Sequence, residues 1–256
     1  YDAWSDSVRR SILLDSKADA LVYGMGERAN LEIAQRMRDG WDWREVRGIC
    51  YMSPKPPEGY IELPSYEDCV QDRGAFARMF RIFRDNSDPS SSKGLYQRHA
   101  NRCLVQNRPQ WQLTTRELDA VHESDYENAV HPYYAKDGHV KAMDTIRNSI
   151  TTHRGCYGDC SFCAIAVHQG RTVTSRSEES ILREVVAMAS KPSFNGTIQD
   201  VGGPTANMYG IECPVKLKNG PCRDRRCLGG KPCPRMPIDH SRQTALLRRI
   251  QDVDGV

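Results

Sequence analysis

The sequence predicts an α/β protein, because two stretches alternate short apolar runs with helical patterns. In the first, an apolar run at 20–23 precedes a glycine turn, a helical pattern at 31–37 and another apolar run at 46–51. In the second, an alternating run at 145–151 leads through a cysteine-rich loop to a helix and a further run at 195–201. Strand–helix–strand units pair their strands in parallel with a right-handed crossover. We therefore expect parallel pairing in each stretch.

The first stretch reads as a strand, a turn and a helix that ends at Gly40, since glycine commonly follows the last helical residue. The run VRGICY at 46–51 is the next expected strand. Gly24 and Gly26 have two interpretations, a tight turn or a contact with a ligand. They lack the remaining positions of a phosphate-binding fingerprint, so the sequence leaves both open.

Residues 54–142 predict a connector made mostly of helix and loop. Ser65 suits a helix N-cap, and the polar run at 85–94 is typical of a linker. Basic and aromatic residues mix at 97–111, which indicates packing against the next domain or, on a clustered basic face, contact with nucleic acid. Three histidines follow at spacings that do not let one helix present two of them to a metal: His122, His131 and His139.

The most informative stretch is 153–163, HRGCYGDCSFC, in which three cysteines fall within eight residues: Cys156, Cys160 and Cys163. Thiolates so close together are soft ligands suited to zinc or an iron–sulfur cluster. Their spacing would also place them on one face of a helix, but Gly155, Gly158 and Asp159 favour a turning loop. Three cysteines leave a four-ligand site with an open position, which marks catalytic rather than structural metals.

This stretch resembles the radical S-adenosylmethionine (SAM) enzymes, and three segments in order are similar to the YgiQ-like group: 8–27, 154–186 and 202–210. The resemblance implies a [4Fe–4S] cluster on Cys156, Cys160 and Cys163, whose open iron chelates SAM. It implies that Phe162 packs near the adenine and that a reductant such as flavodoxin or ferredoxin supplies electrons. The substrate and any catalytic side chain stay unknown.

The resemblance also implies the domain plan. Residues 143–256 would form the first part of a radical SAM (β/α) barrel, with a cysteine-rich loop at 211–236. Residues 1–53 would be the C-terminal part of an α/β, Rossmann-like domain of the kind that often binds cobalamin, and cobalamin use is left open. Because only the first barrel strands are present, we expect a fragment that holds its cluster, binds SAM poorly and is not competent alone.

The family carries a Gly-Gly-Glu-like element after the second barrel strand, where it lines the SAM amino group. The corresponding residues here are Gly202, Gly203, Pro204 and Thr205. Proline replaces the acidic residue, so contact would come from backbone carbonyls or from Thr205, the alternative being a simple turn. Arg171 and Arg176 either bind the SAM carboxylate or, as we favour, pair with local groups.

A second cysteine set occupies the loop at 211–236: Cys213, Cys222, Cys227 and Cys233. Its prolines and glycines disfavour helix and strand, and a loop of this length is uncommon unless something fastens it. Zinc or an auxiliary iron–sulfur cluster would do so, with free thiols or disulfides as the alternative. The isolated cysteines, by contrast, are expected to be buried and unreactive: Cys50, Cys69 and Cys103.

The composition bears on which partners and which cellular compartment are expected. The net charge of +3 does not by itself argue for nucleic acid, and no apolar run is long enough to span a membrane. Ten cysteines without an export signal indicate metal binding in a reducing, cytoplasmic setting. The function that the resemblance implies is that of a radical SAM enzyme; the alternative is a metal-stabilised binding module that contacts RNA without catalysis.

Overall fold

The computed structural model describes residues 1–158, 160–204, 207–220, 222 and 226–256. The chain forms two compact units. The first comprises Tyr1–Gln112 with the short segments Val167–Gly170 and Lys218–Arg225, and the second comprises the remainder. Among the described residues, no helix combines the length and the apolar character that crossing a membrane requires.

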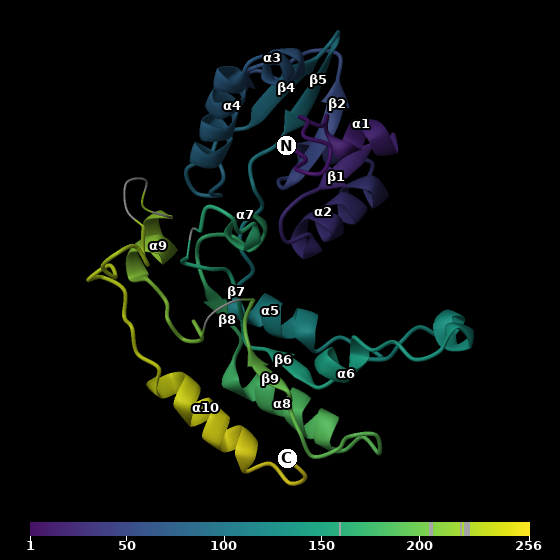
Figure 1. The fold of residues 1–256 in the computed structure, drawn as a ribbon, viewed down its shortest axis with the longest axis vertical. Helices are drawn as coiled ribbons and strands as arrows, with labels where there is room; N and C mark the ends of the chain where they lie inside the picture. The colour runs from purple at the N-terminus through teal and green to yellow at the C-terminus, as the bar shows by residue number, and fades with distance from the viewer. Residues whose placement is uncertain (159, 205–206, 221, 223–225) are drawn as a thin grey trace. The chain divides into compact units, whose positions relative to one another are not determined.

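A five-stranded sheet organises the first unit, in the order β1-β2-β5-β4-β3 (Figure 1). All neighbours are antiparallel except β3 and β4, which are parallel. The strands are β1 (Ala20–Val22), β2 (Ile49–Ser53), β3 (Ile61–Leu63), β4 (Leu95–His99) and β5 (Arg102–Gln106). The helices are α1 (Ile12–Ser16), α2 (Glu27–Arg38), the 3₁₀ helix η1 (Trp43–Glu45), α3 (Tyr66–Gln71) and α4 (Arg73–Asp85).

The prediction of a parallel crossover between 20–23 and 46–51 was wrong, because β1 and β2 are antiparallel. Gly40 ends α2 at a φ of +74°, and the Trp41 amide then bonds back to the Arg36 carbonyl oxygen. The chain returns along α2 through η1, and the Tyr23 amide donates to the Gly48 carbonyl oxygen. The excursion therefore re-enters the sheet at the end from which it left, which gives a long antiparallel connection.

The expected boundary at residue 53 falls inside this unit, because the sheet continues to β5. The region 54–142 contributes three strands, so it is more than helix and loop. Ser65 caps α3 as expected, its hydroxyl accepting from the Asp68 amide, and Asp72 separately caps α4. The isolated cysteines Cys50, Cys69 and Cys103 are all buried, which confirms the burial expected of them.

The second unit contains a parallel strand pair, β6 (Ser149–Thr151) and β9 (Asp200–Gly202), in register from end to end. Along the chain, β6 and β9 are separated by a short antiparallel pair, β7 (His153–Arg154) and β8 (Thr174–Ser175), and by the helix α8 (Glu178–Ala189). Its other helices are α5 (Thr115–His122), η2 (Pro132–Asp137), α6 (Met143–Ile146) and α10 (Ser241–Gln251). Two short helices contain residues of both units: α7 (Ile165–Gln169) and α9 (Pro214–Asn219).

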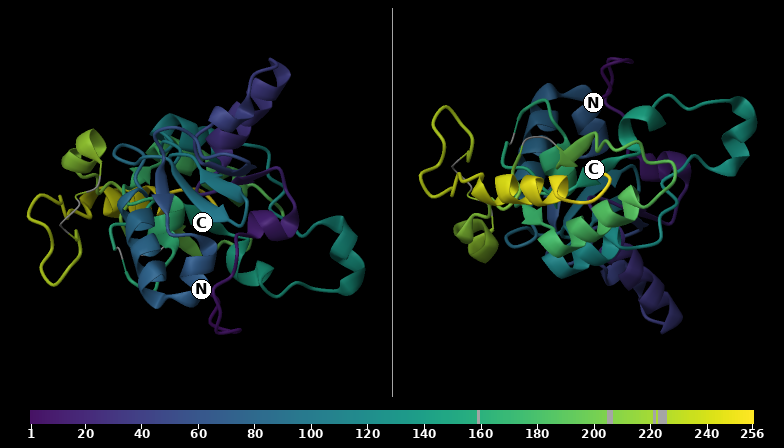
Figure 2. Two further views of the ribbon diagram at one scale, coloured as in Figure 1. Left: turned by 90° about the horizontal axis from the view of Figure 1, so that it is seen from above. Right: turned by 90° about the horizontal axis from the view of Figure 1, so that it is seen from below.

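Packing of α8 and α10 on β6 builds the core of this unit. Ser177 caps α8 as expected, because its hydroxyl accepts from the Ser180 amide, and two glutamates occupy the first turn where negative charge suits the helix dipole. One apolar cluster joins the three elements: Ile150, Ile181, Val185, Met188, Tyr209, Leu246 and Ile250. Figure 2 shows α10 alongside α8, and the segment carrying η2 projecting from the rest of the unit.

Two expectations for this unit need correction. The strand predicted at 145–151 begins only at Ser149, because residues 143–146 form α6 and the Thr145 hydroxyl bonds back to the Ala142 carbonyl oxygen. The cysteine-rich segment was expected to hold little helix, yet α9 forms there, with Pro214 as its first residue. Proline is well suited to the first helical position, where its missing N–H is not needed.

Candidate functional site

The three cysteines of the first motif lie in a loop whose base is closed by backbone pairing. His153 and Arg154 pair with Thr174 and Ser175. The Arg176 amide donates to the Thr152 carbonyl oxygen at 2.9 Å. The loop therefore begins and ends at one place, directly after β6.

Gly155 is required where the loop leaves this base. Its φ is +90°, and an added Cβ would lie 2.1 Å from the Thr172 carbonyl oxygen. Both observations exclude a larger residue, because a positive φ strains L residues and a backbone carbonyl cannot move aside cheaply. Gly155 thus lets the segment that leads to Cys156 pass close against the segment that returns through Thr172.

Two of the three thiols face Gly158. A Cβ on Gly158 would lie 3.2 Å from the Cys156 Sγ and 3.3 Å from the Cys160 Sγ. The Gly158 amide also donates to the Cys156 Sγ at 3.2 Å. Cys163 joins the turn through its amide, which donates to the Cys160 carbonyl oxygen at 3.2 Å.

The thiols differ in exposure: Cys156 is buried, Cys163 half-buried and Cys160 exposed. Within the part of the chain that the structure describes, no three Cys, His, Asp or Glu side chains converge to metal-binding distance. Phe162, expected near an adenine, is 90% exposed. Asp159 and Thr205, both named in the sequence prediction, lie outside the described residues.

The Gly202-Gly203-Pro204 turn follows β9, beside the start of the cysteine loop. The Thr152 amide donates to the Gly202 carbonyl oxygen at 2.7 Å. A Cβ on Gly203 would lie 2.2 Å from two atoms of the His153 ring, so only glycine fits there. The parallel pairing of β6 and β9 thus brings the two sequence-predicted elements together.

Sequence reasoning missed His153. It is 1% exposed, and its Nδ1 lies 3.0 Å from the Thr152 hydroxyl. Its position two residues before Gly155 was visible in the sequence, but no spacing rule connects it to a glycine fifty positions later. The fold alone reveals that it supports the glycine turn.

The second cysteine set packs close to the first. Cys213, Cys227 and Cys233 belong to one cluster with Cys156 and Tyr157. The Tyr157 hydroxyl donates to the Ile211 carbonyl oxygen at 3.0 Å and accepts from the Cys213 amide at 3.2 Å. Burial raises the pKa of Tyr157 to about 12, because the phenolate would be poorly solvated. Cys222 is half-exposed and belongs to the segment assigned to the first unit.

Arg176 pairs locally, as we favoured from the sequence. Its side chain is fully buried and donates to the Thr151 carbonyl oxygen, the Ser180 hydroxyl and the Glu184 carboxylate, at 2.9, 2.9 and 2.5 Å. It therefore ties α8 to the end of β6. Arg171 offers its backbone carbonyl oxygen to the Lys216 ammonium at 2.6 Å.

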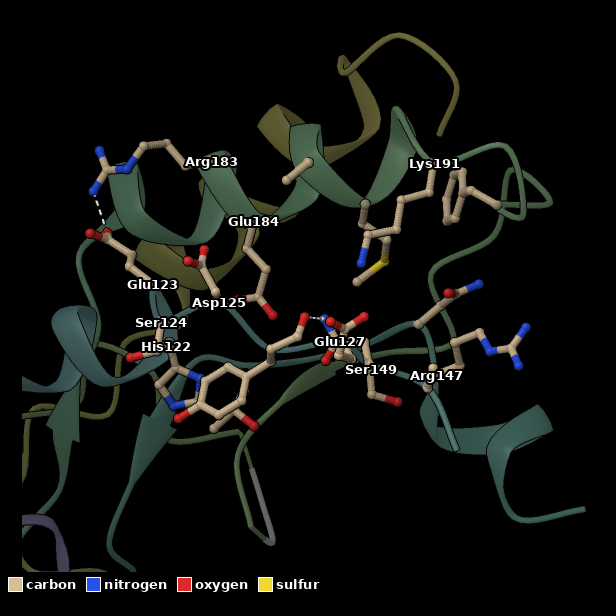
Figure 3. Close-up of a pocket in the computed structure, with 18 of the residues that line it drawn as sticks. His122, Glu123, Ser124, Asp125, Glu127, Arg147, Ser149, Arg183, Glu184 and Lys191 are labelled. Carbon is tan, nitrogen blue, oxygen red and sulfur yellow. Dashed lines mark hydrogen bonds and ion pairs between the residues drawn. The ribbon is translucent and has the colours of Figure 1, made fainter. Parts of the chain in front are cut away.

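A pocket of about 820 Å³ lies between α8, β6 and the segment after α5 (Figure 3). This volume is within the range of small-molecule sites. Figure 3 shows Glu123, Asp125 and Glu184 toward one end, with Arg147 and Lys191 toward the other. Glu123 forms an ion pair with Arg183, and both residues line the pocket. Ser149 and Thr151 of β6 line the pocket, so the strand that leads into the cysteine loop also forms its wall.

Among the predicted histidines, only His122 is found in the described lining of this pocket. His131 accepts from the Tyr133 amide at the start of η2, and His139 lies 2.8 Å from Asp144. Both therefore have local structural partners. The pocket itself was missed from the sequence, because its walls come from three separate segments.

Comparison of the sequence with known proteins shows which family the chain belongs to. Residues 1–149 match the family described as radical SAM N-terminal. A UPF0313 protein of Fusobacterium nucleatum is 47% identical over 256 residues, covering 100% of this chain and 45% of the relative. A UPF0313 protein of Methanocella arvoryzae is 46% identical, and the match covers 100% of this chain and 43% of the relative. A UPF0313 protein of Geobacter sulfurreducens is 44% identical, and the match covers 98% of this chain and 42% of the relative.

The chain thus spans less than half the length of these relatives. The matched region nevertheless extends over essentially all of the chain. The protein belongs to the UPF0313, or YgiQ-like, family of the radical SAM superfamily.

Proposed function

We propose that this protein carries the cluster site of a radical SAM enzyme. Cys156, Cys160 and Cys163 would hold a [4Fe–4S] cluster, and the turn at Gly202 and Gly203 would receive the amino group of SAM. The bound cofactors supply one-electron reductive cleavage of SAM, which yields methionine and a 5′-deoxyadenosyl radical for hydrogen abstraction from a substrate. The observation that carries the proposal is that Cys156 and Cys160 face the same glycine.

The residues around the thiols fit such a cluster. Gly158 presents no side chain to the two sulfurs, so it leaves the space between them open. Its amide donates to the Cys156 Sγ, and hydrogen bonds to ligating sulfurs raise the reduction potential of iron–sulfur clusters. Cys156 is buried while Cys160 is exposed, which keeps one side dry and leaves another accessible to a reductant such as flavodoxin or ferredoxin.

The glycine turn fits a ligand that contacts backbone. His153 packs against Gly203, and the Thr152 amide holds the Gly202 carbonyl oxygen. These two contacts order the turn, and its two glycines add no side chains of their own, which suits close approach of a polar ligand to the backbone. We further propose that the parallel pair β6 and β9, joined through α8, is the start of the barrel that carries such sites at strand C-terminal ends.

Anaerobic reconstitution with iron and sulfide tests the proposal. The wild type should bind about four irons and absorb at about 410 nm, as cysteine-ligated clusters do. Cys156→Ala, Cys160→Ala and Cys163→Ala should each lose that absorbance, whereas Cys103→Ala, which removes an isolated buried thiol, should keep it. SAM cleavage that depends on dithionite would support the enzyme.

Uptake of zinc alone, with no iron chromophore, would refute the cluster and favour the metal-stabilised binding module. An unchanged iron spectrum in all three alanine variants would refute the ligand assignment.

For the second set, which is Cys213, Cys222, Cys227 and Cys233, we propose a further metal, zinc or iron–sulfur, held by the three members that lie in the second unit. Three of these thiols share one cluster, and the Cys233 amide donates to the Cys227 carbonyl oxygen at 2.9 Å, which folds the loop on itself. Elemental analysis of Cys227→Ala checks this. The variant should lose one class of metal and retain the iron held by the first motif.

A further inference from the structure

Lys216 is a buried cation in a sulfur-rich environment. It lies on α9, three residues after Cys213, and is only 5% exposed. Its Nζ donates to the Arg171 carbonyl oxygen at 2.6 Å and lies 4.6 Å from the centroid of the Tyr157 ring. Across the described ranges, no carboxylate forms an ion pair with it.

These two contacts do not neutralise the ammonium group. A carbonyl dipole and an aromatic face attract a cation, but neither carries a net charge. Removing an ammonium from water costs several kcal/mol, so buried lysines are nearly always paired with an anion. Among the residues that the structure describes, the buried site of Lys216 therefore lacks a carboxylate that would compensate its charge.

The groups around it can become anions. Tyr157, whose ring the Lys216 ammonium contacts, directly follows Cys156 in the chain. Its hydroxyl accepts a hydrogen bond from the Cys213 amide. Cys156 and Cys213 belong with Tyr157 to one buried cluster. Cysteine binds a metal as the thiolate, so metal binding creates negative charge in this part of the unit.

We propose that Lys216 is the counter-cation of the cluster held by Cys156, Cys160 and Cys163, and that it sets the reduction potential of that cluster. The inference rests on the proposed function. One-electron reduction, with the electron taken from an external reductant, makes the cluster one charge more negative while Lys216 stays protonated. A fixed cation therefore stabilises the reduced form more than the oxidised form and raises the midpoint potential.

The test compares Lys216→Met with Lys218→Met in anaerobically reconstituted protein. Both changes remove one positive charge from α9, but Lys218 is exposed. An EPR-monitored redox titration with dithionite should give Lys216→Met a more negative midpoint potential than the wild type. Lys218→Met should match the wild type, because exposed charges are screened.

A second readout needs no cluster. In metal-free protein no described carboxylate pairs with the ammonium, so its replacement by an apolar side chain of similar length should leave the urea midpoint equal to or above that of the wild type. If Lys216 serves only as a structural donor to the Arg171 carbonyl oxygen, Lys216→Met should instead lower the urea midpoint and leave the reduction potential of the cluster unchanged.

The outcomes separate the two proposals. If the wild type and Lys216→Met both take up iron and their clusters have the same midpoint potential, the role of Lys216 is overturned. The cluster assignment then still stands. No iron uptake by the wild type would overturn the proposed function and this inference with it. If only Lys216→Met fails to take up iron, Lys216→Arg decides: a cluster at wild-type potential supports the counter-cation, and loss of the cluster overturns it.

Discussion

Replacing Gly155 with alanine should destabilise the second unit more than any ordinary glycine substitution. Two costs add: a φ near +90° costs an L residue about 1–3 kcal/mol, and overpacking adds about 1–3 kcal/mol. The overlap cannot be relieved by a rotamer change, because the atom met at 2.1 Å is the Thr172 carbonyl oxygen. The expected loss is therefore about 2–6 kcal/mol, against roughly 5–15 kcal/mol for a whole domain.

Gly138→Ala is the matched control. Gly138 belongs to the same unit and has a φ of +91°, but a Cβ there meets nothing within 4 Å. Urea unfolding should be followed by far-UV circular dichroism, because Trp4, Trp41, Trp43 and Trp111 all lie in the first unit. The difference between the two variants isolates the steric cost. A loss in Gly155→Ala no larger than in Gly138→Ala would refute the close approach of the backbone at Gly155 to that at Thr172.

Three further outcomes are expected. Arg176→Met should cost about 3–5 kcal/mol of unfolding free energy, because it leaves buried partners without their cation, whereas Arg183→Met, which breaks an exposed pair, should cost under about 1 kcal/mol; equal losses in urea would contradict this. Burial raises the pKa of Tyr157 to about 12 from 10.0, so the stability that its protonated phenol contributes is full below pH 10 and is lost as the pH rises to 12. The stability gap between wild type and Tyr157→Phe should therefore shrink by up to about 2.7 kcal/mol over that window, and a constant gap would argue against the burial. In metal-free protein at pH 8, iodoacetamide followed by peptide mass spectrometry should label the exposed Cys160 and spare Cys50, whose pKa burial raises to about 12; fast labelling of Cys50 would show that its strand opens.

Local features of the fold were predictable from the sequence, because short-range chemistry decides them. Ser65 and Ser177 cap their helices, and Gly40 ends α2 with a positive φ. The parallel pairing of β6 and β9 also followed from the strand–helix–strand order. Burial of Cys50 was expected because it stands alone in an apolar run.

What could not be predicted depends on long-range contacts. The direction of β2 relative to β1 is set by the return of the chain after Gly40, which no periodicity records. The contact of His153 with Gly203 and the bond between Tyr157 and Cys213 each join residues about fifty positions apart. Lys216 reads as one more charge in a basic loop, and only the fold shows that it is buried.

The pairing of His153–Arg154 with Thr174–Ser175 has a consequence for exchange of the metal that we propose this loop binds. A chelating ion normally must overcome the entropy of bringing distant donors together, and that entropy grows with the length of chain between them. Here the pairing of His153–Arg154 with Thr174–Ser175 already closes the base of the loop. An incoming ion therefore has to order only the residues inside the loop. Release of the ion should then require this pairing to open. The rate of release should therefore follow the hydrogen exchange of the Arg176 amide, which is bonded to the Thr152 carbonyl oxygen.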